Sequence, residues 1–385
     1  MPVESGHPRS VTFAAQMGLT PDPAHPGRYA VDVSPEWNCP TVPQGGIMAA
    51  LAARAMQAEL DGDAARDNGD TGGARDDGFR LRTLTTVFAA PVPAGPVEID
   101  VTVLRRGRSM SQLRADVRTP GAGIGHSSVA VFGRTRAGFE FTDATMPEAP
   151  PPHMCPSFRD AGIEDFRPDR PEFPFWDRVE GRPALGHAPW DDWVPTTSEC
   201  ATWFRFGAPP LRPDGSLDPL ALVTLCDTMP GAVGERMGPG TPWWLPPSTD
   251  LTVHVLAEAR SEWLLAQYRA HHAGDGYASA TVHLWDPAVG LVALGTQVMY
   301  LVFPEGPPTG DQRLPADQRS GRHDQTRAHH SGESPAQPEG SEPQAHDRRQ
   351  GESPALPEGS GEPQANDRRQ GESHGHGHDQ TPGRA

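Results

Sequence analysis

Residues 218–233, DPLALVTLCDTMPGAV, read as one central helix with a single acidic side chain inside it. Asp218 stands at an N-cap position, Pro219 at the first helical position, and apolar residues follow at helical spacing. Asp227 lies within this apolar run, where a carboxylate is costly unless it is paired or hydrogen-bonded. Two interpretations stay open: Asp227 faces solvent near the helix end, or it faces a sheet and has a chemical role.

Extended segments surround this helix in a definite order. One precedes it and four follow it: residues 202–206, then 248–255, 263–269, 277–285 and 291–302. The first half of the chain repeats that order, with a strand at 29–33, a helix at 43–57, and strands at 84–88, 97–103, 112–118 and 127–132. The same supersecondary unit occurs twice, which predicts an α+β protein made of two similar modules.

The helix predicted in the first half begins with two glycines, Gly45 and Gly46, and the stretch from Asp61 to Gly78, rich in Asp, Gly and Ala, is expected to be an exposed loop. A helix N-terminus leaves backbone N–H groups without partners, and these groups can donate to an anion or to a polarised carbonyl. Glycines also permit a tight turn or a close approach to a sheet. The sequence alone leaves both interpretations open.

The composition argues against several classes of function. The 385 residues carry a formal net charge of -17, which argues against a nucleic-acid surface. The four cysteines stand far apart without a CxxC pair, so neither a zinc ribbon nor a disulfide framework is indicated. We find no signal peptide and no apolar run of the roughly 20 residues that a membrane span needs, which predicts a soluble cytoplasmic protein.

The sequence pattern predicts four parts. We expect an N-terminal module at residues 1–137, a connection rich in proline and aromatic residues at 138–196, a C-terminal module at 197–304, and a disordered tail at 305–385. The tail contains the repeat GESPAxPEGS and almost no apolar residues, so it cannot bury a core. Its histidine cluster at 374–378 could bind a divalent metal only weakly, and we expect a solvated tail.

Short motifs in the first half resemble the hot-dog thioesterases: Gly45 and Gly46 before the helix, Phe88 with Pro91 at a bend, and LRRGRS at 104–109. With the repeated order of elements, residues 11–303 resemble the double hot-dog fold of the acyl-CoA thioesterase II family and its actinobacterial relatives. The resemblance implies two antiparallel sheets, each wrapped around a central helix. It also implies an acyl-CoA substrate, a place in lipid metabolism and no cofactor. Homo-oligomers are common in the family, but two hot-dog units already form one pair within a chain, so both a monomer and a homo-oligomer stay open.

The second half matches the catalytic positions of that family in order. Asp227 resembles the catalytic aspartate, residues 247–253 resemble the strand with the catalytic hydroxyl, and Gln297 resembles the catalytic glutamine. The hydroxyl has two candidates, because Ser248 stands where the family usually has threonine and Thr249 lies beside it. We rank Ser248 first and Thr249 second, since a shift of one residue along a strand turns a side chain to the opposite face.

Thioester hydrolysis needs an aligned water, a group that accepts its proton, and donors for the developing oxyanion. An apolar surrounding would raise the pKa of Asp227 into the range of a working base. Ser248 and Gln297 would supply neutral hydrogen bonds. The resemblance places the site between the two hot-dog units, so the backbone of Gly45 and Gly46 could supply the oxyanion donors. No metal is required.

Other chemistries lack their motifs. The sequence contains no GxSxG, GxxxxGK[ST] or HExxH stretch, so a serine α/β-hydrolase, a P-loop NTPase and a zinc protease are not indicated. The alternative from a different class is a non-catalytic hot-dog protein that binds acyl-CoA or serves as a scaffold, with Asp227 kept for folding. Release of free thiol from acyl-CoA separates the two hypotheses.

Overall fold

The computed structural model describes residues 11–67, 78–160 and 172–319. In the first half the elements are α1 (Phe13–Gln16), β1 (Thr20–Pro21), β2 (Arg28–Val33), α2 (Gly45–Asp67), β3 (Arg80–Phe88), β4 (Gly95–Arg105), β5 (Met110–Arg118) and β6 (His126–Gly133). In the second half they are α3 (Phe175–Arg178), β7 (Val179–Leu185), β8 (Glu199–Phe206), α4 (Pro219–Cys226), α5 (Pro230–Met237), β9 (Asp250–Val255), β10 (Leu264–Gly274), β11 (Tyr277–Asp286) and β12 (Gly290–Tyr300).

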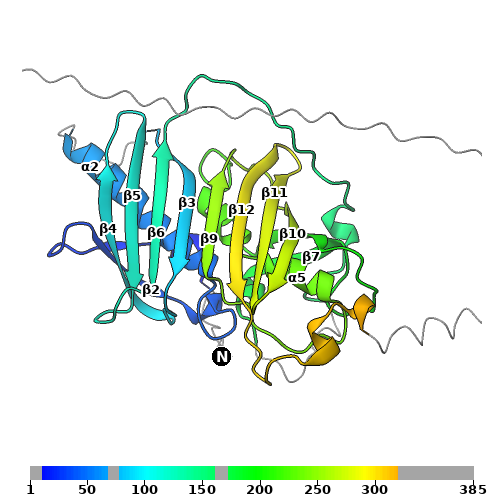
Figure 1. Ribbon diagram of the computed structural model, residues 1–385. Helices are drawn as coiled ribbons and strands as arrows, with labels where there is room; N and C mark the ends of the chain where they lie inside the picture. Colours follow the sequence, from blue (N-terminus) through cyan, green and yellow to red (C-terminus); the bar gives the residue numbers. More distant parts are fainter. Residues whose placement is uncertain (1–10, 68–77, 161–171, 320–385) are drawn as a thin grey trace, which may run out of the picture. The chain divides into compact units, whose positions relative to one another are not determined.

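The two predicted sheets are present and are joined edge to edge. They form a 12-stranded sheet in the order β1-β2-β4-β5-β6-β3-β9-β12-β11-β10-β8-β7 (Figure 1). The junction is an antiparallel pair between β3 and β9, in which Leu84 lies opposite Val253. Each half therefore loses one exposed sheet edge, which would otherwise be a site for unwanted strand pairing.

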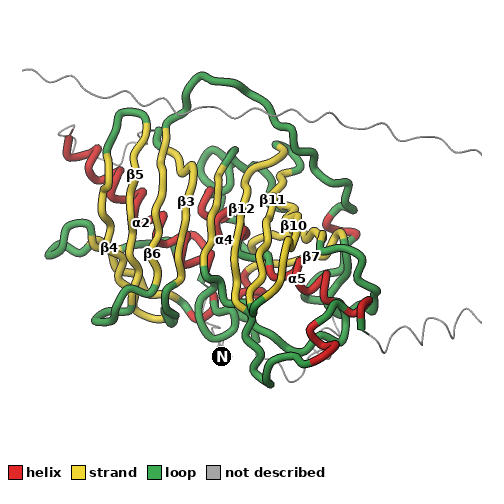
Figure 2. The backbone as a smooth tube through the Cα atoms, in the orientation of Figure 1, coloured by secondary structure: helices red, strands yellow, loops and turns green. Residues whose placement is uncertain are grey.

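The longer helices lie on one face of this sheet (Figure 2). In α2 every residue from 47 to 53 is fully buried, because the strands of the first half lie on one side and α4 of the second half packs on the other. A helix that is apolar all round is stable only inside a core. The contact between α2 and α4 therefore sets how the two halves meet.

The helix predicted at 218–233 is interrupted at its acidic residue. Asp218 caps α4 by accepting from the Leu220 N–H at 3.0 Å, as the sequence predicts. The helix ends after Cys226, Asp227 is its C-cap residue, and α5 begins at Pro230. Proline has no N–H and its ring clashes with the carbonyl four residues earlier, here that of Cys226, so a continuous helix is excluded.

Helix α2 is longer than the sequence predicts. We expected an exposed loop from Asp61 to Gly78, whereas residues 61–67 continue the helix. These residues are mostly alanine, aspartate and arginine, and the single Gly62 costs only about 1 kcal/mol in a helix. The rest of the expected loop, residues 68–77, lies outside the described ranges.

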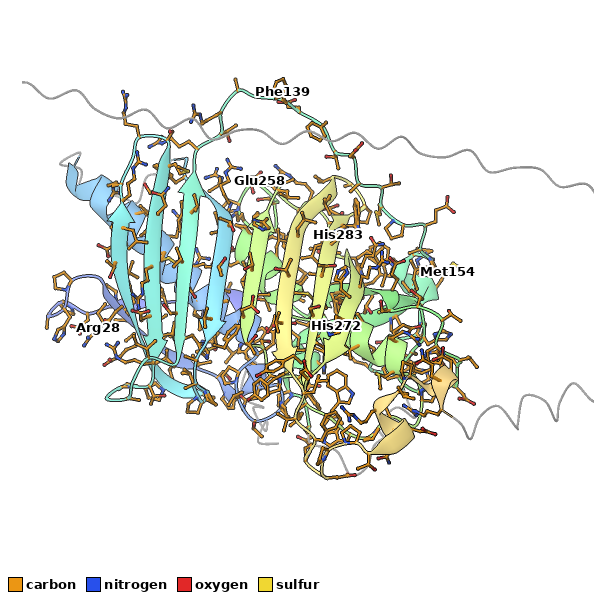
Figure 3. All side chains as sticks on the ribbon, in the orientation of Figure 1. Arg28, Phe139, Met154, Glu258, His272 and His283 are labelled. Carbon is orange, nitrogen blue, oxygen red and sulfur yellow. The ribbon has the colours of Figure 1, made fainter. Side chains whose placement is uncertain are left out.

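The segment expected as a connection contributes packed structure. Its strand β7 forms an edge of the sheet beside β8, and Phe175 is fully buried against Trp37 and Trp176. Phe139 behaves differently: it is fully exposed and stands away from the sheet (Figure 3). The described parts of the connection therefore pack against both halves, while its first residues are exposed on the surface.

Packed structure continues past residue 305, where we expected the disordered tail to begin. Ala316 is fully buried and contacts the region of Gly238, and Arg236 donates to the Asp317 carboxylate at 2.9 Å. Arg319 donates to the Pro239 carbonyl at 3.1 Å. This stretch covers the carbonyl end of α5, so residues 310–319 are packed against the second half. The remainder of the expected tail, residues 320–385, lies outside the described part.

Candidate active site

Asp227 is the centre of a polar cluster that draws residues from both halves. Its Oδ2 accepts from the Gly46 N–H at 2.8 Å, and its Oδ1 accepts from Ser248 Oγ at 3.0 Å and from Gln297 Nε2 at 2.5 Å. Gln297 Nε2 also contacts Ser248 Oγ. The structure thus brings together the start of α2, the end of α4, Ser248 in the segment that leads into β9, and strand β12.

The alternation of β12 explains why Gln297 reaches the carboxylate. Gln297 is buried, whereas its neighbours Thr296 and Val298 are exposed on the opposite face of the sheet. Ser248 forms a β-bridge with Met299, which places it beside the same buried face. Gln297 therefore faces the buried side of β12, where its amide contacts Asp227 at the end of α4.

The two candidates for the hydroxyl, Ser248 and Thr249, have different hydrogen-bond partners. Thr249 Oγ1 donates to the Val298 carbonyl at 2.8 Å and contacts Asp250, away from the Asp227 carboxylate. Ser248 is the hydroxyl that lies against the carboxylate. The period of two along an extended chain accounts for the separation.

The surroundings of Asp227 make it a stronger base than an ordinary aspartate. Burial raises the pKa of its carboxyl to about 6, although hydrogen bonds from Gly46, Ser248, Gln297 and Gly45 favour the charged form and oppose the rise. The four donors that oppose the rise are all neutral. The residue as a whole is partly exposed, while its carboxyl group lies among the buried groups that bond to it.

The two glycines allow the helices to touch. A Cβ on Gly46 would lie 2.8 Å from the Thr224 carbonyl oxygen and 2.9 Å from Asp227 Cβ. A Cβ on Gly45 would lie 2.9 Å from both Asp227 Oδ2 and the Phe88 ring. Close approach and N–H donation, the two interpretations left open by the sequence, are therefore combined here.

The acceptor for the Gly46 N–H differs from the expected one. We predicted that Gly45 and Gly46 leave N–H groups open for a substrate oxyanion. In the structure the Gly46 N–H holds the Asp227 carboxylate instead, because the end of α4 lies directly over the start of α2.

One acceptor in the cluster has no partner. Within the described residues, nothing donates to Gln297 Oε1, although this atom is buried. Buried polar atoms are nearly always hydrogen-bonded, to protein or to ordered water. An unpaired acceptor beside a basic carboxylate suits a polar molecule that carries O–H donors, and water is the smallest of these.

Sequence reasoning missed two residues at this site. Phe88 was noted only as part of a motif, yet its ring closes one side of Gly45. Gln44 was given no role, yet it bonds to Asp227 and Thr224 in the other half. Its position immediately before a glycine-led helix was the available signal.

Two further observations limit the chemistry considered. In the described ranges, no three His, Cys, Asp or Glu side chains are grouped so as to hold a metal ion. No helix in the same ranges is long and apolar enough to cross a membrane.

Two family models match the chain, one in each half. Residues 33–133 match the model described as acyl-CoA thioesterase N-terminal domain. Residues 147–301 match the model described as acyl-CoA thioesterase C-terminal domain. Together they cover more than half of the 385 residues and follow in the order that the two halves predict. No curated protein sequence is significantly similar to the chain.

Solved structures show the same fold. A conserved protein with a hot dog fold from Alicyclobacillus acidocaldarius is 24% identical, with a TM-score of 0.59, and the match covers 76% of this chain and 98% of that one. Acyl-CoA thioesterase II TesB2 from Mycobacterium marinum is 21% identical, with a TM-score of 0.55 and coverages of 77% and 100%. A tesB protein from Mycobacterium avium subspecies paratuberculosis is 19% identical, with a TM-score of 0.54 and coverages of 77% and 98%. At these identities the likeness shows the double hot-dog fold.

Proposed function

The chain belongs to the acyl-CoA thioesterase family and is a thioester hydrolase, and we propose that it hydrolyses acyl-CoA by means of a water held on Asp227. The observation that carries this proposal is the convergence of Ser248, Gln297 and the Gly46 N–H on one carboxylate whose pKa is raised to about 6. A base with a pKa near the operating pH combines a useful ionised fraction with useful basicity.

The proposed reaction begins with removal of a proton from water. Asp227 accepts that proton while the water oxygen forms a bond to the thioester carbonyl carbon, and Gln297 Oε1 accepts a hydrogen bond from the other water hydrogen. The tetrahedral intermediate then expels the thiolate of CoA as the C–S bond breaks. Asp227 returns its proton to the thiolate, so the products are the free acid and the thiol.

The oxyanion donors of this proposal are the N–H groups of Gly45 and Gly46. A carboxyl group that has taken up a proton is a weaker acceptor than a carboxylate. Proton transfer to Asp227 would therefore loosen its hold on the Gly46 N–H at the moment when negative charge develops on the substrate oxygen. Donors aimed at that charge are usually the largest single contribution to such reactions.

The experiment follows thiol release from acyl-CoAs of varied chain length by the purified chain. We expect turnover in the wild type and loss of turnover in Asp227→Asn with the fold preserved. Binding of acyl-CoA without turnover in the wild type, unchanged in Asp227→Asn, would instead support the non-catalytic alternative.

A single-turnover reaction in H₂¹⁸O tests the role of Asp227 as base rather than nucleophile. If Asp227 deprotonates water, the label enters the released acid in the first turnover and the enzyme stays unlabelled. A covalent acyl–aspartyl anhydride, hydrolysed by attack of water on the aspartyl carbon, would place the label in Asp227. Mass spectrometry of the acid and of the peptide that contains Asp227 distinguishes the two outcomes.

A further inference from the structure

Gln44 links the two halves of the molecule beside the candidate base. It precedes α2 and is 5% exposed. Its Nε2 donates to the carbonyl oxygens of Thr224 and Asp227, each at 3.0 Å, and its Oε1 accepts from the Ile47 N–H at 3.1 Å. Both amide hydrogens and the amide oxygen are therefore used inside the protein.

These bonds join two helix ends of opposite polarity. The Ile47 N–H lies in the first turn of α2 and also donates to the Gln44 backbone carbonyl at 3.1 Å. The carbonyls of Thr224 and Asp227 lie at the end of α4, and the Thr224 carbonyl also accepts from the Asp227 N–H at 3.2 Å. One side chain thus caps a helix in each half. The Gln44 N–H in turn donates to the Trp37 carbonyl at 2.9 Å, which fixes its backbone.

We propose that Gln44 is a positioning residue for hydrolysis, which holds the start of α2 against the end of α4 and thereby holds the Gly46 N–H on the Asp227 carboxylate. The inference rests on the role proposed above for Asp227. Gly46 lies two residues from Gln44, and its N–H is 2.8 Å from Asp227 Oδ2. Any movement of the two capped helix ends changes this contact directly.

The contacts require an amide rather than a group of similar size. Glutamate has the same shape, but when ionised it only accepts hydrogen bonds, so it would face the carbonyls of Thr224 and Asp227 with like partial charge. Methionine keeps the length and removes every polar contact. Gln44→Glu and Gln44→Met therefore perturb the same link in two different ways, and each remains informative if the other fails to fold.

A second buried glutamine provides a matched control. Gln16 is 2% exposed, and its amide donates to the Asp32 carbonyl at 3.1 Å and accepts from the Ser34 N–H at 3.0 Å. These partners belong to α1, β2 and the turn after β2, not to the Asp227 cluster. Gln16→Met thus removes comparable hydrogen bonds from a buried amide elsewhere.

The measured quantities are kcat, KM, the melting temperature and the acid limb of the kcat/KM profile. We expect both Gln44 variants to lower kcat about 10- to 100-fold with KM changed less than about threefold, since small misplacements of catalytic groups cost that much. The acid limb should move to higher pH by about half a unit or more, because a carboxylate that loses a donor becomes easier to protonate. Gln16→Met should lower the melting temperature and leave kcat and the acid limb unchanged.

Other titratable groups around Asp227 do not account for an acid limb near pH 6. Burial raises the pKa of the Cys39 and Cys226 thiols far above that range, and the charge of Asp227 raises both further. His126 packs edge-on against the Phe88 ring with centroids 4.9 Å apart, and burial lowers its pKa to about 4. The carboxylate of Asp250, the first residue of β9, accepts from the Val298 N–H at 3.0 Å and, among the described residues, forms no hydrogen bond to Asp227.

Two outcomes are decisive and separate the two proposals. If Gln44→Met and Gln44→Glu lower only the melting temperature, as Gln16→Met does, while kcat and the acid limb stay at wild-type values, Gln44 is merely structural and the inference fails. If Asp227→Asn, assayed alongside, keeps wild-type kcat, the assignment of the base fails whatever the Gln44 variants do. A ¹³C NMR titration of the Asp227 carboxyl in the Gln44 variants gives its pKa without reference to turnover.

Discussion

At each end of the contact between α2 and α4, an acidic residue of α4 bonds to α2, but the partner of the carboxylate differs. The helices run antiparallel, so the start of each lies beside a later turn of the other. At one end Gly46, near the start of α2, donates its N–H to Asp227. At the other end Asp218, at the start of α4, forms an ion pair with Arg54 of α2, with Nη2 2.5 Å from Oδ2.

The difference lies in what neutralises the carboxylate. The guanidinium of Arg54 offsets the charge of Asp218, and the ion pair links the two halves. The donors that the described residues offer to Asp227 are neutral, and burial raises its pKa to about 6. The same helix packing therefore yields a structural link where a cation is present and a base where it is absent.

The largest effect that tests this comparison is expected from Asp227→Asn. The change preserves shape and removes the base, so kcat for acyl-CoA hydrolysis should fall by about 10²–10⁴. Asp218→Asn, which removes the carboxylate at the other end, should leave kcat within about threefold. Equal losses of activity in the two variants, measured by thiol release, would mean that the two ends do not differ in chemistry.

Ser248→Ala should lower kcat about 10- to 100-fold, because it removes one of the donors that hold the carboxylate and the water. Thr249→Val is the matched control, since Thr249 bonds to the Val298 carbonyl instead. Its kcat should stay near the wild-type value. A reversed order of the two variants would assign the catalytic hydroxyl to Thr249.

The pH dependence of stability should reveal the free-energy cost of burying the charged form of Asp227. Its folded-state pKa, about 6, lies above the ordinary value of 3.8, so the folded state binds the extra proton between these pH values. Its contribution to the free energy of unfolding is therefore full below about pH 4 and is lost as pH rises through 6, by at most about 3 kcal/mol. Asp227→Asn should abolish this loss, and chemical denaturation at pH 4 and pH 7.5 measures it. An equal pH dependence in wild type and variant would contradict it.

Gly46→Ala should destabilise the fold by about 1–3 kcal/mol, because its Cβ would overlap the Thr224 backbone. Gly62, in the same helix, has no atom within 4 Å of an added Cβ. Gly62→Ala should therefore stabilise by about 0.5–1 kcal/mol through helix propensity alone. Urea unfolding of both variants checks whether close approach, rather than helix content, explains the glycine at 46.

The smallest effect is expected from Arg54→Met, which removes the ion pair with Asp218 at the other end of the helix contact. A partly exposed ion pair stabilises by up to about 1 kcal/mol, and the apolar stem of the side chain is retained. We expect a slightly lower melting temperature and an unchanged kcat. A loss of turnover comparable to that of Ser248→Ala would show that this end also positions the base.

Much of this arrangement could be predicted from the sequence, because it follows from local periodicity. Residues 97–103 alternate and form part of β4, and Asp218 with Pro219 starts α4 where the capping pattern places it. The helix break at Asp227 was not predicted. Apolar spacing across residues 218–233 favoured one helix, and the clash of the Pro230 ring with the preceding turn was not taken into account. The continuous sheet was also missed, since pairing of β3 with β9 depends on two segments far apart in the chain.

What the sequence determined by itself was a lone carboxylate, Asp227, inside an apolar helical run, where a buried charge needs a partner. Ser248 and Gln297 were assigned through the resemblance to the acyl-CoA thioesterases, with Ser248 ranked ahead of Thr249 because neighbouring strand residues face opposite ways. Only the tertiary structure decided which partner each one meets. The Gly46 N–H and the amide of Gln44 meet Asp227 because the end of α4 lies over the start of α2, a contact between residues at least 180 positions apart in the chain. Ser248 rather than Thr249 meets the carboxylate because its side chain points to the buried face of the extended segment.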